Sequence, residues 1–344
     1  MQAGESLNVP AHLPPRGGKG EKREKMYQYL LRRLLITVPT VLGISVVLFS
    51  ILALAPGDPF EELALNPDIP TEVRLHLRQQ FGLDDPLPLR YLHWLTAMLR
   101  GEWGYSFASR VNVSVLIWQR LPTTLFVLGT AYGLALCIAL PVGVISAVKP
   151  YSLFDHVATA FAFVGHSLPT FFTALLFILL FSLHLGWLPF IYSTTIEAQG
   201  LAWITEHLRQ GAMPIVVVGL FESASLTRFV RAAMLEVIHQ DFVTTARAKG
   251  LPEWRTILGH VLRNALLPVV TVMALQVPGI FTGAVITEQI FRVPGIGSLL
   301  ISAIQSSDTP VVMAITFVYA VLVVAFNVVA DLVYGLLDPR ITYV

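Results

Sequence analysis

Long apolar runs recur along the chain, separated by polar segments. Crossing the hydrocarbon core of a bilayer takes about 20 consecutive apolar residues in a helix. Five of the runs reach that length, and the short fourth run can continue through Arg228 to the membrane interface. The pattern predicts six membrane-spanning helices, at Leu34–Ala55, Leu121–Val148, Val157–Leu183, Met213–Leu226, Ala265–Ile286 and Pro310–Ala330.

The composition agrees with a membrane protein. Apolar residues make up 55% of the 344 residues and charged residues 13%, whereas soluble proteins average about 25% charged residues. Because backbone groups inside lipid must be paired within the segment, helices fit these runs. Barrel strands would be about 10 residues long and alternating. The predicted fold class is an all-α polytopic membrane protein. The single cysteine, Cys137, is expected to be a small apolar core residue of the second span.

The distribution of basic residues predicts the orientation in the membrane. Lys and Arg concentrate in short loops on the cytoplasmic side. Seven basic residues precede the first run, and six lie in segment 228–263. Segments 184–212 and 287–309, on the other side, hold one each. The N-terminus is therefore predicted to be cytoplasmic, and six spans return the C-terminus to the same side.

Two segments outside the spans have their own character. Residues 1–25 are rich in Gly, Pro and charge and are predicted to be a disordered cytoplasmic tail. Met26 begins the ordered part, and the sequence leaves open whether it is the true start. Segment 56–120 is too long for a turn and is predicted to be an extracytoplasmic insertion resting on the membrane face. Its expected helices are Pro70–Phe81 and Leu89–Leu99.

The polar segment between the fourth and fifth runs is the most informative. Its middle reads Asp241-Phe-Val-Thr-Thr-Ala-Arg-Ala-Lys-Gly250-Leu-Pro-Glu, and Arg263-Asn-Ala-Leu-Leu-Pro268 enters the next run. These residues resemble the EAA loop of binding-protein-dependent ABC importer permeases, in the form found in the dipeptide/oligopeptide/nickel subfamily. One departure is that Thr244 and Thr245 stand where the general loop has a glutamate and its first alanine.

Shorter matches to the same subfamily occur in order over residues 26–344. Each short piece is weak alone, but their order and spacing together are specific. They are Tyr29–Arg33, Ala55–Pro59, Phe81–Asp84, Gly101–Gly104, Leu121–Thr124, Phe291–Gly297 and Leu337–Arg340.

The resemblance implies a type I ABC importer permease, with residues 26–344 as its transmembrane domain in the bacterial cytoplasmic (inner) membrane. Implied partners are a second homologous permease, two ABC ATPase subunits, an extracytoplasmic solute-binding protein and membrane lipid. Whether the permease pair is hetero- or homodimeric stays open. Di- or oligopeptides would pass by alternating access. A cytoplasmic coupling helix at 241–253 would sit in a groove of the ATPase, through Thr245, Ala246, Arg247, Ala248, Lys249, Gly250 and Leu251.

The chemistry of this loop suits such a contact. Ala246 and Ala248 favour a helix and keep its surface low, so that another protein can approach. Gly250 can take a positive φ and end the helix, and Pro252 prevents its continuation. Arg247 and Lys249 offer charge to an acidic rim. An ordinary positive-inside loop is the simpler alternative.

Polar residues inside the spans are candidate pathway residues. Glu222 lies in the fourth span, where a carboxylate is costly and by default a functional candidate; a structural ion pair or hydrogen bond is the alternative. His166 lies in the third span before Pro169, and it either lines the pathway or bonds carbonyls freed by the proline. Glu288 is near a span end, where solvation at the interface is expected.

Several function classes lack their motifs. No GxxxxGK[ST] phosphate-binding loop occurs, so ATP and Mg²⁺ are expected on the partner ATPases, with no cofactor in this chain. The nine histidines show no metal-ligand spacing, and nothing in the charge indicates nucleic acid. Nickel or another small solute is the alternative cargo. An intramembrane enzyme is a weaker rival, since no catalytic pair accompanies His166 or Glu222.

Overall fold

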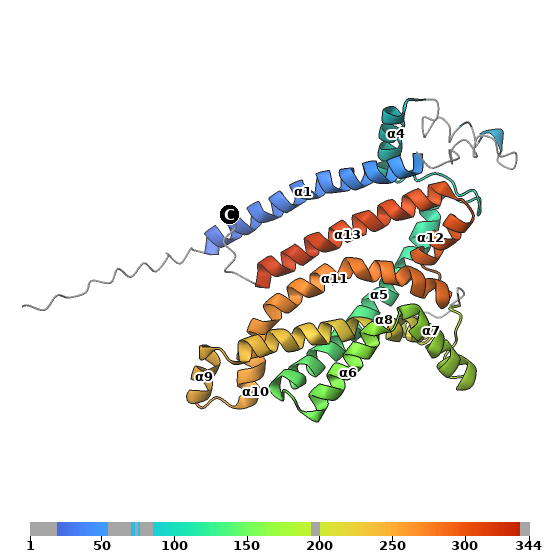
Figure 1. Ribbon diagram of the computed structural model, residues 1–344. Coiled ribbons are helices and arrows are strands. Elements are labelled where there is room, and N and C mark those ends of the chain that lie inside the picture. Colours follow the sequence, from blue (N-terminus) through green and yellow to red (C-terminus); the bar gives the residue numbers. More distant parts are fainter. Residues whose placement is uncertain (1–18, 54–69, 73–74, 76–84, 194–199, 338–344) are drawn as a thin grey trace, which may run out of the picture.

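The computed structural model describes residues 19–53, 70–72, 75, 85–193 and 200–337, and the named elements within them are all helical (Figure 1). Two of the elements, η1 and η2, are π-helical turns that continue neighbouring helices. The elements are α1 (Lys19–Ala53), α4 (Leu87–Arg100), α5 (Val113–Val148), α6 (Leu153–Ser167), α7 (Thr170–Phe177), η1 (Ile178–His184), α8 (Leu201–Ile238), α9 (Asp241–Ala248), α10 (Glu253–Arg255), η2 (Thr256–Val261), α11 (Leu262–Ile290), α12 (Ile296–Gln305) and α13 (Thr309–Leu337).

Four or five stretches of the described chain are long and apolar enough to cross a membrane. The fifth is the pair of helices 153–167 and 170–184, if it counts as one bent span. Within the described residues, the apolar part of α1 is the shorter stretch Leu35–Ile51, and the predicted run Leu34–Ala55 ends beyond them. The four unbroken stretches are Val113–Val148, Ile204–Ile238, Glu253–Phe281 and Thr309–Val333.

The third apolar run, predicted as one span over Val157–Leu183, is divided into two helices. α6 ends at Ser167, and the following helix is bent away from it by 102°. Leu168 between them is extended, with φ −78° and ψ 128°. The cause is Pro169, because a proline ring disfavours the helical conformation in the residue before it.

Glycines bring α5 and α8 into close contact. A Cβ atom on Gly143 of α5 would lie 2.7 Å from the Val230 side chain of α8. A Cβ atom on Gly219 of α8 would lie 3.0 Å from the carbonyl oxygen of Ala131. The glycines with GxxxG spacing do not serve this contact. They meet no other part of the described chain within 4 Å at their Cβ positions: Gly129, Gly133, Gly279 and Gly283.

The molecule has two distinct ends (Figure 1). α9 and α10 lie at one end, together with the described beginning of α1 and the end of α13, whereas α4 and α12 lie at the other. An aromatic cluster holds α4 in place, since the Trp94 ring lies 5.7 Å from Phe49 of α1 and 5.8 Å from Phe317 of α13. Both ends of the described chain therefore share the end that carries α9.

The structure refines two predictions about the first third of the chain. α4 confirms the predicted helix Leu89–Leu99 and extends it to Leu87–Arg100. The helix predicted for Pro70–Phe81 lies largely outside the described residues. α1 begins at Lys19, so that residues 19–25 of the predicted disordered tail are helical. Lys, Arg and Glu dominate that stretch and are good helix formers.

Candidate functional site

The helix α9 ends in a well-defined hydrogen-bonded turn. Gly250 has φ +78°, and its N–H donates to the carbonyl of Arg247 at 2.9 Å. The N–H of Leu251 donates to the carbonyl of Ala246 at 3.3 Å. These two bonds form the Schellman arrangement that glycine favours at helix ends. α9 is thus shorter than the predicted range 241–253, and the chain turns where Gly250 predicted that it would.

One side of α9 packs against α8 and η2 of the same chain, and this buried contact is called the seat of α9. Val243 is fully buried, in a cluster that includes Met234 of α8 and Ile257 of η2. Ala246 is also buried, so it supports the seat of the helix rather than its outer surface. The outer surface is formed by Thr244, Thr245, Arg247, Ala248, Lys249 and Gly250, with Leu251 half-buried.

An ion pair bridges the turn after α9. Arg247 donates to Glu253 through Nη2 at 2.6 Å and through Nε at 3.1 Å. The hydrogen bond to Glu253 raises the pKa of the already basic Arg247. Trp254 is exposed, and the guanidinium of Arg255 lies 5.0 Å from its ring centre. Since both partners of the ion pair are largely exposed, it contributes at most about 1 kcal/mol, and the glycine turn and buried seat define the geometry.

Glu222 lies half-buried in the middle of α8. Among the residues that the structure describes, none donates a hydrogen bond to its carboxylate. Ser225, one turn on, accepts from Gln276 of α11 at 3.1 Å, and Tyr132 of α5 donates to the carbonyl of Met273 at 2.9 Å. Neither of these two hydrogen bonds involves the Glu222 carboxylate. The arrangement leaves a carboxylate able to receive a donor from outside the described chain.

His166 belongs to α6 and lies against a different side of α8 from the one that carries Glu222. It is exposed, and its ring stacks on Phe221 of α8 with centroids 5.2 Å apart. Phe221 and Glu222 are consecutive and point about 100° apart around the helix. The structure therefore places the two candidate pathway residues near α8 without bringing them into contact. Its His166–Phe221 stack was not predicted from the sequence.

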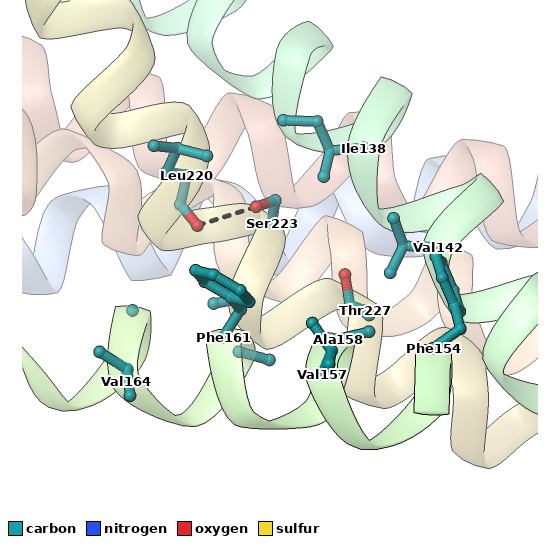
Figure 2. A pocket seen from close by; sticks show the side chains of 13 residues that line it. Ile138, Val142, Phe154, Val157, Ala158, Phe161, Val164, Leu220, Ser223 and Thr227 are labelled. Atoms are coloured by element: carbon teal, nitrogen blue, oxygen red, sulfur yellow. Dashed lines mark hydrogen bonds between the residues drawn. The ribbon is translucent and has the colours of Figure 1, made fainter. Parts of the chain in front are cut away.

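An apolar groove of about 410 Å³ runs between α5, α6 and α8 (Figure 2). Its lining includes Ile138 and Val142 of α5, Phe154 and Phe161 of α6, and Leu220 of α8. The hydroxyl of Ser223, also in the lining, donates to the carbonyl of Leu220 at 2.8 Å, as the dashed line shows. The Thr227 hydroxyl is the other polar side-chain group in the lining, and the remaining lining residues are apolar, so the groove favours apolar groups.

Glu288 corrects a sequence-based expectation, because it is buried rather than solvated. Its carboxylate accepts from the Thr124 hydroxyl of α5 at 2.6 Å and from the Ser298 N–H of α12 at 3.0 Å. The Ile296 N–H donates to Thr124 at 2.9 Å. Side chains from α5 and α11 thus cap the first turn of α12, which begins after Gly295 without a local cap. A side chain at Gly295 would overlap the carboxylate.

This junction explains why two short motifs occur together. Leu121–Thr124 supplies the hydroxyl, and Phe291–Gly297 supplies the turn and the Ile296 N–H. The other backbone donor, Ser298, directly follows the second motif. The two glycines of the second motif, Gly295 and Gly297, both lie against Glu288. Sequence reasoning missed the junction, although closely spaced glycines before an apolar helix were a usable sign of tight backbone approach.

Cys137 also differs from expectation. It was predicted to be a core residue of its span, but it is exposed on α5. It lies one turn beyond Gly133, on the side of α5 that the described chain leaves uncovered.

Comparisons with known proteins agree with the resemblance in the sequence. Residues 139–343 match the family described as "Binding-protein-dependent transport system inner membrane component", and residues 26–128 match its N-terminal component. The chain is 41% identical over 319 residues to the oligopeptide transport system permease protein AppB of Bacillus subtilis, covering 92% of this chain and 100% of that protein.

Two further relatives have similar coverage. The dipeptide transport system permease protein DppB of Escherichia coli is 36% identical over 338 residues. The di/tripeptide transport system permease protein DppB of Pseudomonas aeruginosa is 37% identical over 334 residues. Each alignment covers 92% of this chain and 99% of the relative.

Proposed function

The chain belongs to the family of inner membrane components of binding-protein-dependent transport systems, and from this premise we propose that it forms one half of the membrane pathway of an ATP-driven importer of di- or oligopeptides. It is a multi-pass inner-membrane permease, and such permeases work with ATPase subunits and a solute-binding protein. The peptide cargo is supported by relatives whose names specify oligopeptides, dipeptides and tripeptides.

The observation that carries the proposed mechanism is α9. It is a short helix with a fixed end, seated on a buried cluster and exposed on its other side. We assign Thr245, Arg247, Ala248 and Lys249 to the contact with an ATPase. Ala246 and Leu251 would hold the helix on its seat, and Gly250 would end it. Movement of the ATPases would then reach α8 and α11 through α9.

The proposed assembly contains two homologous permeases, two ATPases that bind ATP and Mg²⁺, and an extracytoplasmic binding protein. No cofactor or catalytic residue is assigned to this chain. The four glycines with GxxxG spacing, which contact no other part of the described chain, support a second permease, because small residues allow close helix contact in membranes.

In the proposed orientation α9 is cytoplasmic. Six spans then follow if α1 and the bent pair α6–α7 each cross once, and both termini are cytoplasmic. This is supported by the basic residues near α9 and by the shared end of α1, α13 and α9 (Figure 1). Segment 56–120, with α4, would be extracytoplasmic.

Glu222 and His166 are the proposed pathway residues. Glu222 would attract the α-ammonium group of a passing peptide, because a half-buried carboxylate without a donor gains most from a cation. His166, exposed and held by stacking, would offer a polar edge to the peptide backbone.

The proposal is tested with the complete transporter in vesicles. Ala248→Glu places an unpaired charge on the exposed side of α9, and uptake should fall at least about tenfold, which corresponds to roughly 1.4 kcal/mol of lost contact. Ala202→Glu, at an exposed alanine of α8 that precedes the apolar stretch Ile204–Ile238, is the matched control and should retain uptake. Normal ATPase binding and uptake by Ala248→Glu would show that α9 is only a connector.

Cargo is identified separately. Candidate compounds are added to the cognate binding protein, and its melting temperature is followed. A rise with di- or oligopeptides supports the proposed cargo, whereas a rise only with nickel or another small solute replaces it.

A further inference from the structure

The helix α4 carries apolar side chains on two opposite sides. One side is buried, with Trp94 1% and Met98 4% exposed. On the other side Leu89, Leu92 and Leu99 are 45%, 52% and 71% exposed. Positions 89, 92 and 99 repeat at helical spacing, so these three leucines form one outward stripe. The described chain therefore covers the side of α4 that carries Trp94 and Met98. It leaves the side that carries the three leucines uncovered.

A polar edge runs beside the leucine stripe. His93 and Arg100 are seven residues apart and thus lie two turns from each other on one line of the helix. Both are exposed, and His93 Nδ1 lies 3.2 Å from Asp85. α4 therefore presents a leucine stripe and a polar stripe side by side on its free surface. Such a division is typical of helices that lie in a membrane–water boundary.

The contacts of α4 with α1 indicate how deeply α4 lies in the membrane. The Tyr91 hydroxyl is hydrogen-bonded to Ser45 at 2.8 Å, and Trp94 packs on Phe49. Ser45 and Phe49 lie inside the apolar stretch Leu35–Ile51 of α1. At 1.5 Å per residue, Ser45 is about 9 Å from the end of that stretch. α4 is therefore packed beside the last turns of an apolar helix, at the level where hydrocarbon gives way to headgroups.

The direction of α4 agrees with this depth. Figure 1 shows it lying crosswise to α1 and α13, the helices that it contacts. Its C-terminus is turned by Gly101, which has φ +79° and donates its N–H to Met98 at 3.2 Å. The chain thus leaves α4 without continuing along the spans. A helix crosswise to the spans, at the edge of the hydrocarbon, runs along the membrane surface.

We propose that α4 is an interfacial helix that inserts the stripe Leu89–Leu92–Leu99 between lipid acyl chains and holds His93 and Arg100 among the headgroups. Its partner is the lipid bilayer itself, and the proposed function places it in the outer leaflet. Anchored to α1 and α13 by the aromatic cluster around Trp94, it fixes the height of these two helices in the membrane.

The test measures how deeply individual positions of α4 lie in the membrane. Single cysteines replace Leu92, Leu99, His93 or Arg100 in a Cys137→Ser background, and each carries a nitroxide label. The complete transporter is reconstituted in phospholipid vesicles without ATP or cargo. Collisions with oxygen, which concentrates in acyl chains, are compared with collisions with a water-soluble nickel chelate.

Labels at Leu92 and Leu99 should collide preferentially with oxygen, and labels at His93 and Arg100 preferentially with the chelate. A label at buried Met98 is the control for a position shielded by protein. Preferential chelate collisions at Leu92 and Leu99 would place the stripe in water and overturn the proposal. Low collision rates with both reagents, as at Met98, would mean that protein covers the stripe and would equally overturn it.

The outcome is independent of whether the transporter carries peptides. Uptake and ATPase binding are not part of the measurement, so a stripe found in water or under protein would leave the proposed transport function intact. Normal uptake by Ala248→Glu, which would contradict the proposed role of α9, would likewise leave the depth of α4 unchanged.

Discussion

Arg231 of α8 holds the buried carboxylate of Asp155 of α6 with two parallel hydrogen bonds, from Nε at 2.6 Å and from Nη2 at 2.7 Å. The residues are 76 positions apart, and Asp155 is only 2% exposed. A third bond reaches the carboxylate from the Tyr151 N–H at 2.9 Å. The pair joins α6 to α8 two turns before α8 ends and α9 begins. The pair therefore ties α6 to the end of α8 that leads into α9.

Substitution of Arg231 should destabilise the protein more than substitution of Asp155. Arg231→Met leaves a buried carboxylate with its charge unpaired, and the cost should approach about 3–5 kcal/mol. Asp155→Ala should cost less, because the Arg231 side chain is 27% exposed and can turn to water. Thermal unfolding in detergent measures both, and the double variant should lose less than the sum of the two. Additive losses would show that the pair does not couple the helices.

The contact between Glu288 and Gly295 predicts that a substitution at Glu288 will offset the destabilisation caused by a side chain at Gly295. Gly295→Ala should cost about 1–3 kcal/mol by overpacking, because the new methyl group meets the Glu288 carboxylate. Combining it with Glu288→Ala should remove the collision, so that the double variant is more stable than the sum of the single losses predicts. Gly297→Ala is the matched control. Its methyl group would also lie 2.8 Å from the Val285 Cα atom, so the same partner change should not rescue it.

The glycines of α5 should divide into two classes. Gly143→Ala should destabilise the isolated chain by about 1–3 kcal/mol, because the methyl group would collide with Val230. Gly133→Ala meets no atom of the described chain and should leave its thermal stability nearly unchanged. Under the proposed assembly, the larger change Gly133→Leu should instead weaken association with the second permease. Equal destabilisation by the two alanine variants would contradict the α5–α8 packing.

The proposed orientation is tested by chemical labelling. Ser109, in the segment between α4 and α5, and Glu253, in α10, are both exposed. α4 and α10 lie at opposite ends of the molecule (Figure 1). In a Cys137→Ser background, a cysteine at position 109 should react with an impermeant maleimide in intact cells. A cysteine at position 253 should react only after the membrane is permeabilised. The reverse result would exclude the assignment of α9 to the cytoplasm.

Glu222 should influence which cargo passes. Glu222→Gln keeps the size of the side chain and removes its charge, so the attraction for an α-ammonium group is lost. Uptake of free peptides should fall relative to uptake of peptides with a blocked N-terminus, whereas assembly and ATPase binding should stay normal. Failure of assembly would support a structural role. Unchanged uptake of both cargo types would exclude Glu222 from cargo selection.

Much of the fold was predictable from local sequence. Apolar runs indicated membrane helices, because lipid requires every backbone group to be paired within its segment. Gly250 and Pro252 predicted the end of α9, because positive φ and the missing proline N–H act over only a few residues. Pro169 was a visible sign of the broken third run. The order of short motifs identified the family that the comparisons then confirmed.

Positions of side chains between helices were decided only by the tertiary structure. Local sequence could not show that Thr124, Glu288 and Ser298 meet, since they come from three helices. Nor could GxxxG spacing tell which glycines are used inside the chain, because that depends on which face of α5 turns toward α8. The same holds for Ala246, which its helix turns toward the buried seat. Periodicity determines that a helix has faces, but only packing against other helices determines what each face contacts.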